Sequence, residues 1–316
     1  MEINKIVVAC VVVTYNPSSV EFETIHSLIK SKHQFKVILI VIDNSDLIDS
    51  RLRIREIVDS LAVPIDERNA FNYVKYIQNE HNIGLSRAYN IGIKLAQSFG
   101  SDIILFFDQD SKFNDEFIQT MINDYMRLSA RNFNFILSPT VILKKTRIQS
   151  SYLTLKRMFL MLIGHLYEDQ DIAEELFAIN SGVLIPLKLL LSSLIYDETL
   201  FVDAIDISIC QQARRKNIHI YRSKRAILTH SFSTSLISLG GLTLPIGIHN
   251  DQRLYHMVKD YLNLFKKQFA YFPIETLEQL FYRIITVTGS ILISKNKHKT
   301  IVAILKAFSE FLTQNS

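Results

Sequence analysis

The stretch "DIILFFDQDS", residues 102–111, joins an apolar run to a pair of acids. Five consecutive apolar residues, Ile103 to Phe107, suit a strand that is covered on both faces. Asp108 and Asp110 follow this strand directly, at the end where open α/β sheets bind their ligands. The short D-x-D string alone leaves two interpretations equally open: a solvated acidic turn, or a metal and nucleotide site.

The segments around this stretch predict alternating strands and helices. Apolar runs at 6–13 and 37–42 indicate buried strands, and "YVKYIQN" from residue 73 a shorter one. Helical patterns lie between them, at 17–30, 49–61 and 85–100. This alternation predicts an α/β fold with a mostly parallel central sheet and helices on both faces. Further along, "HIYRSKRAILTH" (219–230) predicts two short strands.

Composition indicates a folded protein with a sizeable core. The chain has 316 residues, 48% hydrophobic and 21% charged, enough for one large domain or two small ones. Cys10 and Cys210 stand alone, and no hydrophobic signal sequence opens the chain. We therefore expect a reducing, cytoplasmic location with two buried thiols. No apolar stretch reaches the roughly 18–20 residues of a membrane-spanning helix.

The positive charge is concentrated near the C-terminus. Residues 251–316 carry nine Lys and Arg against five Asp and Glu, whereas residues 1–250 carry 26 of each. A neutral body with a basic, apolar tail is more typical of a protein that binds a membrane surface than of one that binds nucleic acid. Nucleic-acid-binding proteins normally have a broad basic face. Helical, amphipathic patterns are expected in this tail at 251–271, 274–293 and 298–313.

Polar clusters follow four successive predicted strands: "TYN" (14–16), "DNS" (43–45), "NEHNIG" (79–84) and "DQD" (108–110). Each cluster alone is typical of a turn or cap. In a parallel sheet, however, these strand ends share one edge, so the clusters are expected to converge on one crevice. Neither G-x-G-x-x-G nor G-x-x-x-x-G-K-[ST] occurs, which argues against a nicotinamide dehydrogenase and a P-loop kinase.

In this order, "VVVTYNP", "VIDNSD", "NEHNIGLSRAYNIGIKLA" and "LFFDQDS" resemble the nucleotide-sugar half of family-2 inverting glycosyltransferases with the GT-A fold. The resemblance continues through "INSGVLIP" and "YDETLFVDAIDISICQQARRKNIHI" to "ILTH", and is closest to the rhamnosyltransferase-like branch. It covers roughly residues 5–232. It implies a Rossmann-like catalytic domain over residues 1–250 and a helical extension over residues 251–316.

The resemblance implies the donor site. The residues expected to hold the nucleotide or flank its diphosphate are Thr14, Tyr15, Asn16, Asp43, Asn82, Gly84, Arg87 and Asp108. A helix N-terminus after Gly84 favours phosphate, and Arg87 adds a positive charge. Arg87 is equally compatible with an ordinary surface arginine.

The resemblance also implies a divalent cation, Mg²⁺ or Mn²⁺. Asp110 would be its direct ligand, and Asp108 would face the ribose or a metal-bound water. His230 matches a position that often supplies another metal or phosphate contact. Without the resemblance, a histidine after a strand is more often structural. The cation would neutralise the departing nucleoside diphosphate.

The catalytic base is expected in "FVDAIDISICQQARR". Alignment with the family places Asp206 at the base position, with Asp203 as a nearby second carboxylate. Helix capping is the alternative for both. The implied reaction is a single displacement with inversion, in which a hydroxyl of a glycan or lipid-linked acceptor takes the sugar. L-Rhamnose from dTDP-rhamnose is the preferred donor, with galactose, glucose and furanose donors left open.

Two other functions compete with this one. A haloacid-dehalogenase-type phosphatase would carry D-x-D at its first strand and Thr or Val at the position of Lys112. A non-catalytic nucleotide-sugar-binding relative would not need Asp108, Asp110, Asp206 and His230 together.

The tail leaves its own alternatives open. Its apolar faces would pack on the catalytic domain, form a homodimer, or rest on the anionic inner face of the plasma membrane. "HNDQRLYHMVKDYLN" keeps an Arg and a Tyr of the family's segment but has Lys259 and Asp260 in place of Arg-Asn, so its role stays undecided.

Overall fold

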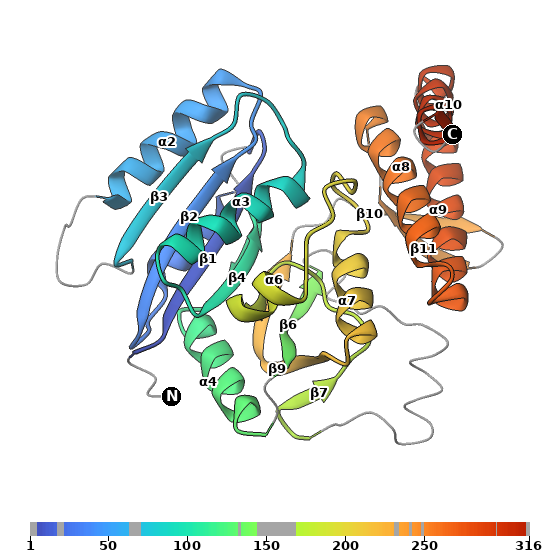
Figure 1. Cartoon of the computed structure of the whole chain (residues 1–316). Coiled ribbons are helices and arrows are strands. Elements are labelled where there is room, and N and C mark those ends of the chain that lie inside the picture. Colours follow the sequence, from blue (N-terminus) through green and yellow to red (C-terminus); the bar gives the residue numbers. More distant parts are fainter. Residues whose placement is uncertain are drawn as a thin grey trace.

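The fold is a mixed α/β sheet flanked by helices, followed by a helical C-terminal part (Figure 1). The computed structural model describes residues 5–17, 22–62, 71–131, 134–143, 169–230, 234–239, 242–247, 250–294 and 296–313. Nine strands form the central sheet in the order β3-β2-β1-β4-β8-β6-β9-β5, with β7 paired to β9. The predicted α/β class with flanking helices and a helical C-terminal part is therefore confirmed, but the sheet is mixed and not mostly parallel, because β4–β8, β6–β8, β5–β9 and β7–β9 are antiparallel pairs.

The first four strands are parallel and form the predicted half of the sheet: β1 (Val7–Thr14), β2 (Lys36–Asp43), β3 (Tyr73–Gln78) and β4 (Ile103–Asp108). Both faces of β1 are covered, because Ala9, Val11 and Val13 lie in one apolar cluster and Val8, Cys10 and Val12 in another. Burial on both sides explains why the strand is apolar throughout instead of alternating.

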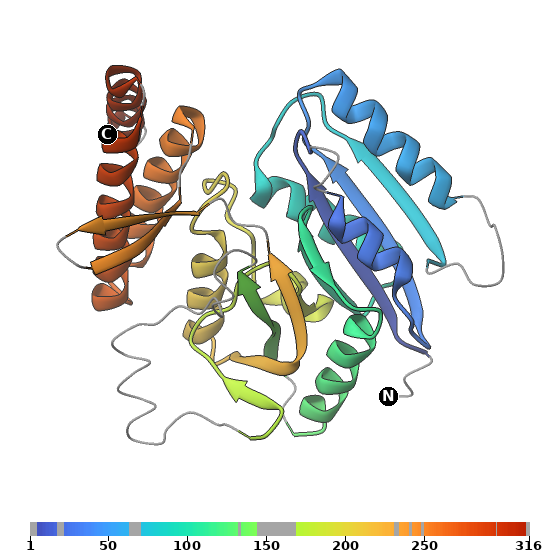
Figure 2. The same cartoon turned by 180° about the vertical axis from the view of Figure 1, so that it is seen from behind.

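Helices cover the sheet from two sides (Figures 1 and 2). One face is covered by α1 (Glu23–Lys30), α2 (Ile48–Ala62) and α4 (Phe117–Ser129). The other is covered by α3 (Leu85–Ser98), α6 (Leu187–Ser192), α7 (Ile205–Arg215) and α8 (Asp251–Gln268). α2 and α3 match the helices predicted at 49–61 and 85–100 to within two residues at each end, and α1 begins at Glu23 instead of the predicted residue 17. α4 and α6 were not predicted.

The second half of the sheet is largely antiparallel and brings distant segments to β4. It consists of β5 (Ser111–Phe113), β6 (Phe135–Leu143), β7 (Ile172–Glu174), β8 (Val183–Pro186) and β9 (His219–His230). β8 is antiparallel to β4, and β5 is antiparallel to β9. β9 is one strand of 12 residues, so the prediction of two short strands there was wrong.

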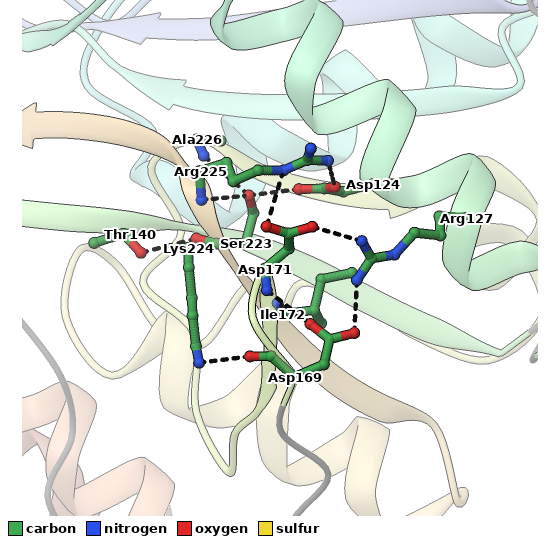
Figure 3. Close-up of polar contacts among 10 residues, drawn as sticks. All are labelled: Asp124, Arg127, Thr140, Asp169, Asp171, Ile172, Ser223, Lys224, Arg225 and Ala226. Carbon is green, nitrogen blue, oxygen red and sulfur yellow. Dashed lines mark hydrogen bonds and ion pairs between the residues drawn. The ribbon is translucent and has the colours of Figure 1, made fainter.

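A polar network supports the irregular middle of β9, where its register against β6 shifts between Ser138 and Thr140. Its members come from α4, the start of β7 and β9: Asp124, Arg127, Asp169, Asp171, Ser223 and Arg225 (Figure 3). Ser223 Oγ donates to the fully buried Asp124 carboxylate at 2.6 Å, and Arg225 pairs with the same acid. Beyond this point β9 continues to His230, opposite Ser111 of β5.

The C-terminal part contains α8, α9 (Pro273–Ile293) and α10 (Lys297–Thr313), close to the three predicted helices. A hairpin of β10 (Thr234–Leu239) and β11 (Leu242–Gly247) lies beside α9 (Figure 2). α8 shares an apolar cluster with α7 and the sheet, so it is joined to the rest of the fold through the core. Among the described residues, no helix has the length and apolar character needed to cross a membrane.

Candidate active site

The ends of β1, β2 and β4 meet at one edge of the sheet, as the sequence predicted. Thr14 lies opposite Asp43, and Val13 lies opposite Asp108. A crevice of about 520 Å³ opens beside this edge. Nine of the predicted site residues line it: Thr14, Tyr15, Asn82, Gly84, Asp108, Asp110, Asp203, Asp206 and His230.

The D-x-D acids and His230 are in direct contact although they lie far apart in the sequence. His230 Nε2 is 3.0 Å from an Asp108 oxygen and 3.3 Å from an Asp110 oxygen. Burial lowers the pKa of His230, but its hydrogen bond to Asp108 and the charges of both acids outweigh this effect, so the pKa is raised. The pairing of β5 with β9 creates this contact, because it places His230 opposite Ser111.

This donor set suits a hard divalent cation, since it offers two carboxylates and one imidazole nitrogen. Within the described part of the chain, no group of three or more His, Cys, Asp or Glu side chains is arranged so that it could hold a metal ion by itself. Asp108, Asp110 and His230 could serve as ligands only together with oxygen atoms from elsewhere.

Thr24 of α1 fixes the turn that carries these acids. Its hydroxyl donates to the backbone oxygens of Asp108 and Ser111, at 2.5 and 3.0 Å, and accepts from the Ser111 N–H at 2.9 Å. The Thr24 side chain is fully buried. The D-x-D turn is thus held by a helix that contributes no side chain of its own to the crevice lining.

Asp43 does not line the crevice, in contrast to its predicted contact with the nucleotide. It is fully buried, and its carboxylate accepts from Thr14 Oγ1 (3.1 Å), the Ser45 N–H (2.9 Å) and the Tyr76 hydroxyl (2.8 Å). Burial and this acid raise the pKa of Tyr76. In this structure Asp43 supports the Thr14 loop from behind.

Asn16 and Arg87, also predicted to contact the donor, do not line the crevice either. The Asn16 side chain accepts from the N–H groups of Asp46 and Leu47, both at 3.0 Å, and so holds the loop before α2. Arg87 points to Glu198, 3.4 Å away, and both side chains are largely exposed. In this structure Arg87 is an exposed surface arginine, the alternative that the sequence left open.

Gly84 allows the start of α3 to lie close to Phe201 on the opposite side of the crevice. Its φ of +85° favours glycine, and a Cβ there would lie 2.8 Å from the Phe201 ring. The Leu85 N–H donates to the Phe201 carbonyl at 2.6 Å, and Asn82 accepts from the Gly84 N–H at 3.0 Å. The start of α3 is therefore packed against the segment that leads to Asp203.

Both candidate bases face the crevice from the start of α7. The N-cap of this helix is Ala204, with a φ of 61°, and no side chain caps it. Asp203 is consequently not used as a helix cap, and its Oδ2 lies 3.7 Å from Arg253 Nε. Asp206 lies in the first turn, where its charge also suits the helix dipole, and it accepts from the Ile207 N–H at 2.9 Å.

Sequence reasoning missed the contribution of the C-terminal helices. Asn250, Arg253, Tyr261 and Arg283 line the crevice from α8, its N-cap and α9. Asp260 of α8 lies beneath it and accepts from the N–H groups of Phe201, Val202 and Asp203, at 2.8, 2.9 and 2.8 Å. A signal was present in the sequence: Asp260 shares the apolar face of α8 with Met257, Tyr261 and Leu264, where an acid needs a partner.

Burial raises the pKa of Asp260 to about 7, against the three backbone hydrogen bonds, which favour its charged form. The Phe201 ring also stacks on His256 of α8, with ring centroids 3.8 Å apart. The segment 201–203 is therefore fixed by α8 on one side and by the start of α3 on the other.

Comparisons with known proteins agree with this geometry. Residues 9–134 match the family model described as glycosyl transferase family 2. The dTDP-rhamnosyl transferase RfbF of Shigella flexneri is 24% identical over 287 residues, which cover 91% of this chain and 89% of that protein.

Solved structures share the fold. A GalNAc-T7 structure with UDP, GalNAc and Mn²⁺ superimposes on 83% of this chain with a TM-score of 0.57 at 13% identity. The S. aureus TarS structure superimposes on 97% with a TM-score of 0.54 at 16% identity. The chain spans about half, 48%, of each of those two chains. From these comparisons and the crevice, we conclude that the chain has the GT-A fold, that residues 9–134 are similar to glycosyl transferase family 2, and that most of the chain is similar to a dTDP-rhamnosyl transferase.

Proposed function

We propose that the chain transfers a sugar, L-rhamnose from dTDP-rhamnose, to a hydroxyl of a glycan or lipid-linked acceptor with inversion. One observation carries this proposal: the D-x-D acids and His230 share a crevice with Asp203 and Asp206. A nucleotide-sugar transferase needs those two sets of groups in one place. The similarity to a dTDP-rhamnosyl transferase supports the choice of sugar.

On the donor side, Thr14, Tyr15, Asn82 and Gly84 would receive the nucleotide. Asp108, Asp110 and His230 would hold Mg²⁺ or Mn²⁺ beside its diphosphate. A bound cation would neutralise the charge that the leaving nucleoside diphosphate gains. Asp108 and Asp110 raise the pKa of His230, and a cation bound to those acids would oppose this effect.

On the acceptor side, Asp206 would act as general base, with Asp203 as the second candidate. The acceptor oxygen forms a bond to the anomeric carbon while the bond from that carbon to the diphosphate oxygen breaks. The electron pair leaves with the nucleoside diphosphate, and the hydroxyl proton passes to the Asp206 carboxylate. Holding the two substrates in one crevice makes this attack effectively unimolecular.

A donor panel tests the proposal. The full chain is incubated with dTDP-rhamnose, UDP-galactose, UDP-glucose and a nucleotide furanose, each with Mg²⁺, with Mn²⁺ and with excess EDTA. We expect dTDP release from dTDP-rhamnose, its loss in EDTA, and an inverted anomeric centre in the product by NMR. Hydrolysis of simple phosphate esters would instead favour the phosphatase. Donor binding without turnover would favour the non-catalytic relative.

A further inference from the structure

α9 has an inverted distribution of side chains. Six residues of this helix are buried, and all are polar or small: Glu275, Thr276, Gln279, Thr286, Gly289 and Ser290. Six large apolar residues are exposed instead: Ile274, Leu277, Phe281, Ile284, Leu292 and Ile293. Phe281, for example, is 66% exposed. A surface helix of a water-soluble domain normally has the opposite arrangement.

α10 repeats this inversion. Its buried residues are Thr300 and Ala307, whereas Ile301, Val302, Leu305, Phe308 and Leu312 are exposed. We call the exposed apolar residues of these two helices, taken together, the α9–α10 apolar surface. Apolar areas of this kind on a folded chain indicate a binding surface.

Specific polar contacts hold the apolar surface outward. Glu275 pairs with Arg214 of α7, with Arg214 Nη1 at 2.8 Å, and both side chains are largely buried. Thr300 Oγ1 donates to Asp251 of α8 at 2.8 Å. Rotating α9 or α10 to bury its apolar residues would break these contacts and leave buried polar groups without partners, which is unfavourable. The outward orientation is therefore part of the fold.

The charges exposed on α9 and α10 all have one sign. Over their described residues, every exposed charged side chain is a lysine: Lys297, Lys299 and Lys306. The acids Glu275, Glu278 and Glu310 are buried or half-buried. Glu310 lies between Lys259 of α8, at 3.1 Å, and Lys306, at 3.9 Å, and Asp251 of α8 lies 4.0 Å from Lys299.

We propose that α9 and α10 form a peripheral membrane-binding surface that takes anionic lipid headgroups. Apolar side chains would enter the boundary between headgroups and acyl chains, and the lysines would meet the anionic headgroups. A second copy of the chain fits less well, because a two-fold contact over this surface would set lysines against lysines. The helices would lie on the membrane, which agrees with the lack of a described helix able to span one. This property does not depend on the proposed sugar transfer.

Vesicle flotation of the full chain tests the proposal without donor or metal. We expect binding to phosphatidylglycerol vesicles at low salt, release at high salt, and much weaker binding to phosphatidylcholine. Each neutralised lysine should lower the partition coefficient about fivefold. The triple variant Lys297→Gln, Lys299→Gln, Lys306→Gln should therefore bind about 100-fold more weakly.

A second variant tests the apolar contribution: Phe281→Ser, Leu305→Ser, Phe308→Ser. These side chains are exposed, so the melting temperature should be unchanged while binding is lost. Three apolar residues at and just before the start of α2 provide the matched control, because Leu47, Ile48 and Leu52 are 59%, 71% and 62% exposed. Their replacement by Ser should leave vesicle binding unchanged.

Three results would overturn the proposal. The first is equal binding to neutral and anionic vesicles, and the second is binding to neither. The third is a dimer, seen by light scattering, that is lost in the Phe281→Ser, Leu305→Ser, Phe308→Ser variant. That dimer would identify a second copy of the chain as the occupant of the α9–α10 apolar surface.

Discussion

Asp260 links the C-terminal helices to the proposed base through one carboxylate. It accepts three backbone N–H groups from residues 201–203, just before Asp206. In Asp260→Asn, an NH₂ group would replace one of the two carboxylate oxygens. This donor would then face backbone N–H groups, which are also donors. Because small misplacements of a reacting group can cost about 100-fold in rate, we expect Asp260→Asn to lower kcat 10- to 100-fold with little change in KM. Asp251→Asn, on the same helix but outside this contact, should keep kcat.

The pH dependence of this variant separates positioning from a general loss of structure. The pKa of Asp260 is raised to about 7, above the roughly 3.9 of an unfolded chain, so the folded state retains a proton between those values. Its contribution to stability is full below about pH 4 and is lost as pH rises to about 7. The hydrogen bonds to residues 201–203 need the carboxylate, so transfer should increase as pH rises through about 7. Asp260→Asn should lack both effects; parallel pH curves for the two proteins would contradict the assignment.

The two candidate bases can be distinguished by isosteric replacement. Asp206→Asn removes the proton acceptor but leaves the crevice intact, so transfer should fall by at least 100-fold while dTDP-rhamnose binding, measured by calorimetry, is nearly unchanged. Asp203→Asn should retain more activity, because the negative charge of Asp203 is already partly balanced by Arg253. If Asp203→Asn is the inactive variant, the two roles must be exchanged.

At this scale the sequence predicted which residues gather at the strand ends better than where each side chain points. Asp108, Asp110, Asp206 and His230 line the crevice because their backbone positions already place them there. Asp43 and Asn16 occupy the expected loops. Hydrogen bonds from Tyr76 to Asp43 and from Leu47 to Asn16 hold their side chains against the protein. Such contacts depend on distant residues and leave no periodic signal.

At the scale of elements, α1 acts on the Asp108–Ser111 turn without reaching the crevice. Thr24→Val keeps the shape of the side chain but leaves the Ser111 N–H without its acceptor. We expect a loss of about 1–3 kcal/mol of unfolding free energy. The metal concentration that gives half-maximal transfer should also increase, because the Asp108–Ser111 turn becomes less rigid. Thr24→Ser should restore both values; an equal defect in Thr24→Ser would show that the methyl group, not the hydroxyl, matters.

Element types were predictable where burial or periodicity is strong. The two-sided burial of β1, β2 and β4 gives continuous apolar runs, and α8 to α10 have helical periods. The continuity of β9 was not predictable, since it depends on the Asp124–Ser223 contact between α4 and the strand. The outward orientation of α9 and α10 was equally hidden, because the same apolar period fits a core-facing helix.

At the scale of the whole molecule, the predicted division at residue 250 separates segments that share a core. Leu254, Met257, Tyr261 and Leu264 of α8 are buried in the cluster that includes α7 and the sheet. Asp260 and Arg253 extend the same contact to the crevice. The division of the chain into domains 1–250 and 251–316 remains a prediction from the sequence. In the structure, residues of both parts line the crevice.

Truncated chains test whether residues 1–250 need α8 in order to fold. Fully burying a large apolar side chain contributes about 1.5–3 kcal/mol, so four of them approach the 5–15 kcal/mol that a folded domain has in total. A chain ending at residue 250 should therefore lose its cooperative thermal transition and bind ANS, the more so because three N–H groups at 201–203 lose their acceptor. A chain ending at residue 272 keeps α8 and provides the control; it should retain a transition at reduced temperature, since the Arg214–Glu275 pair is lost. A shorter chain that melts as sharply as the full one and still binds dTDP-rhamnose would show that residues 1–250 fold independently.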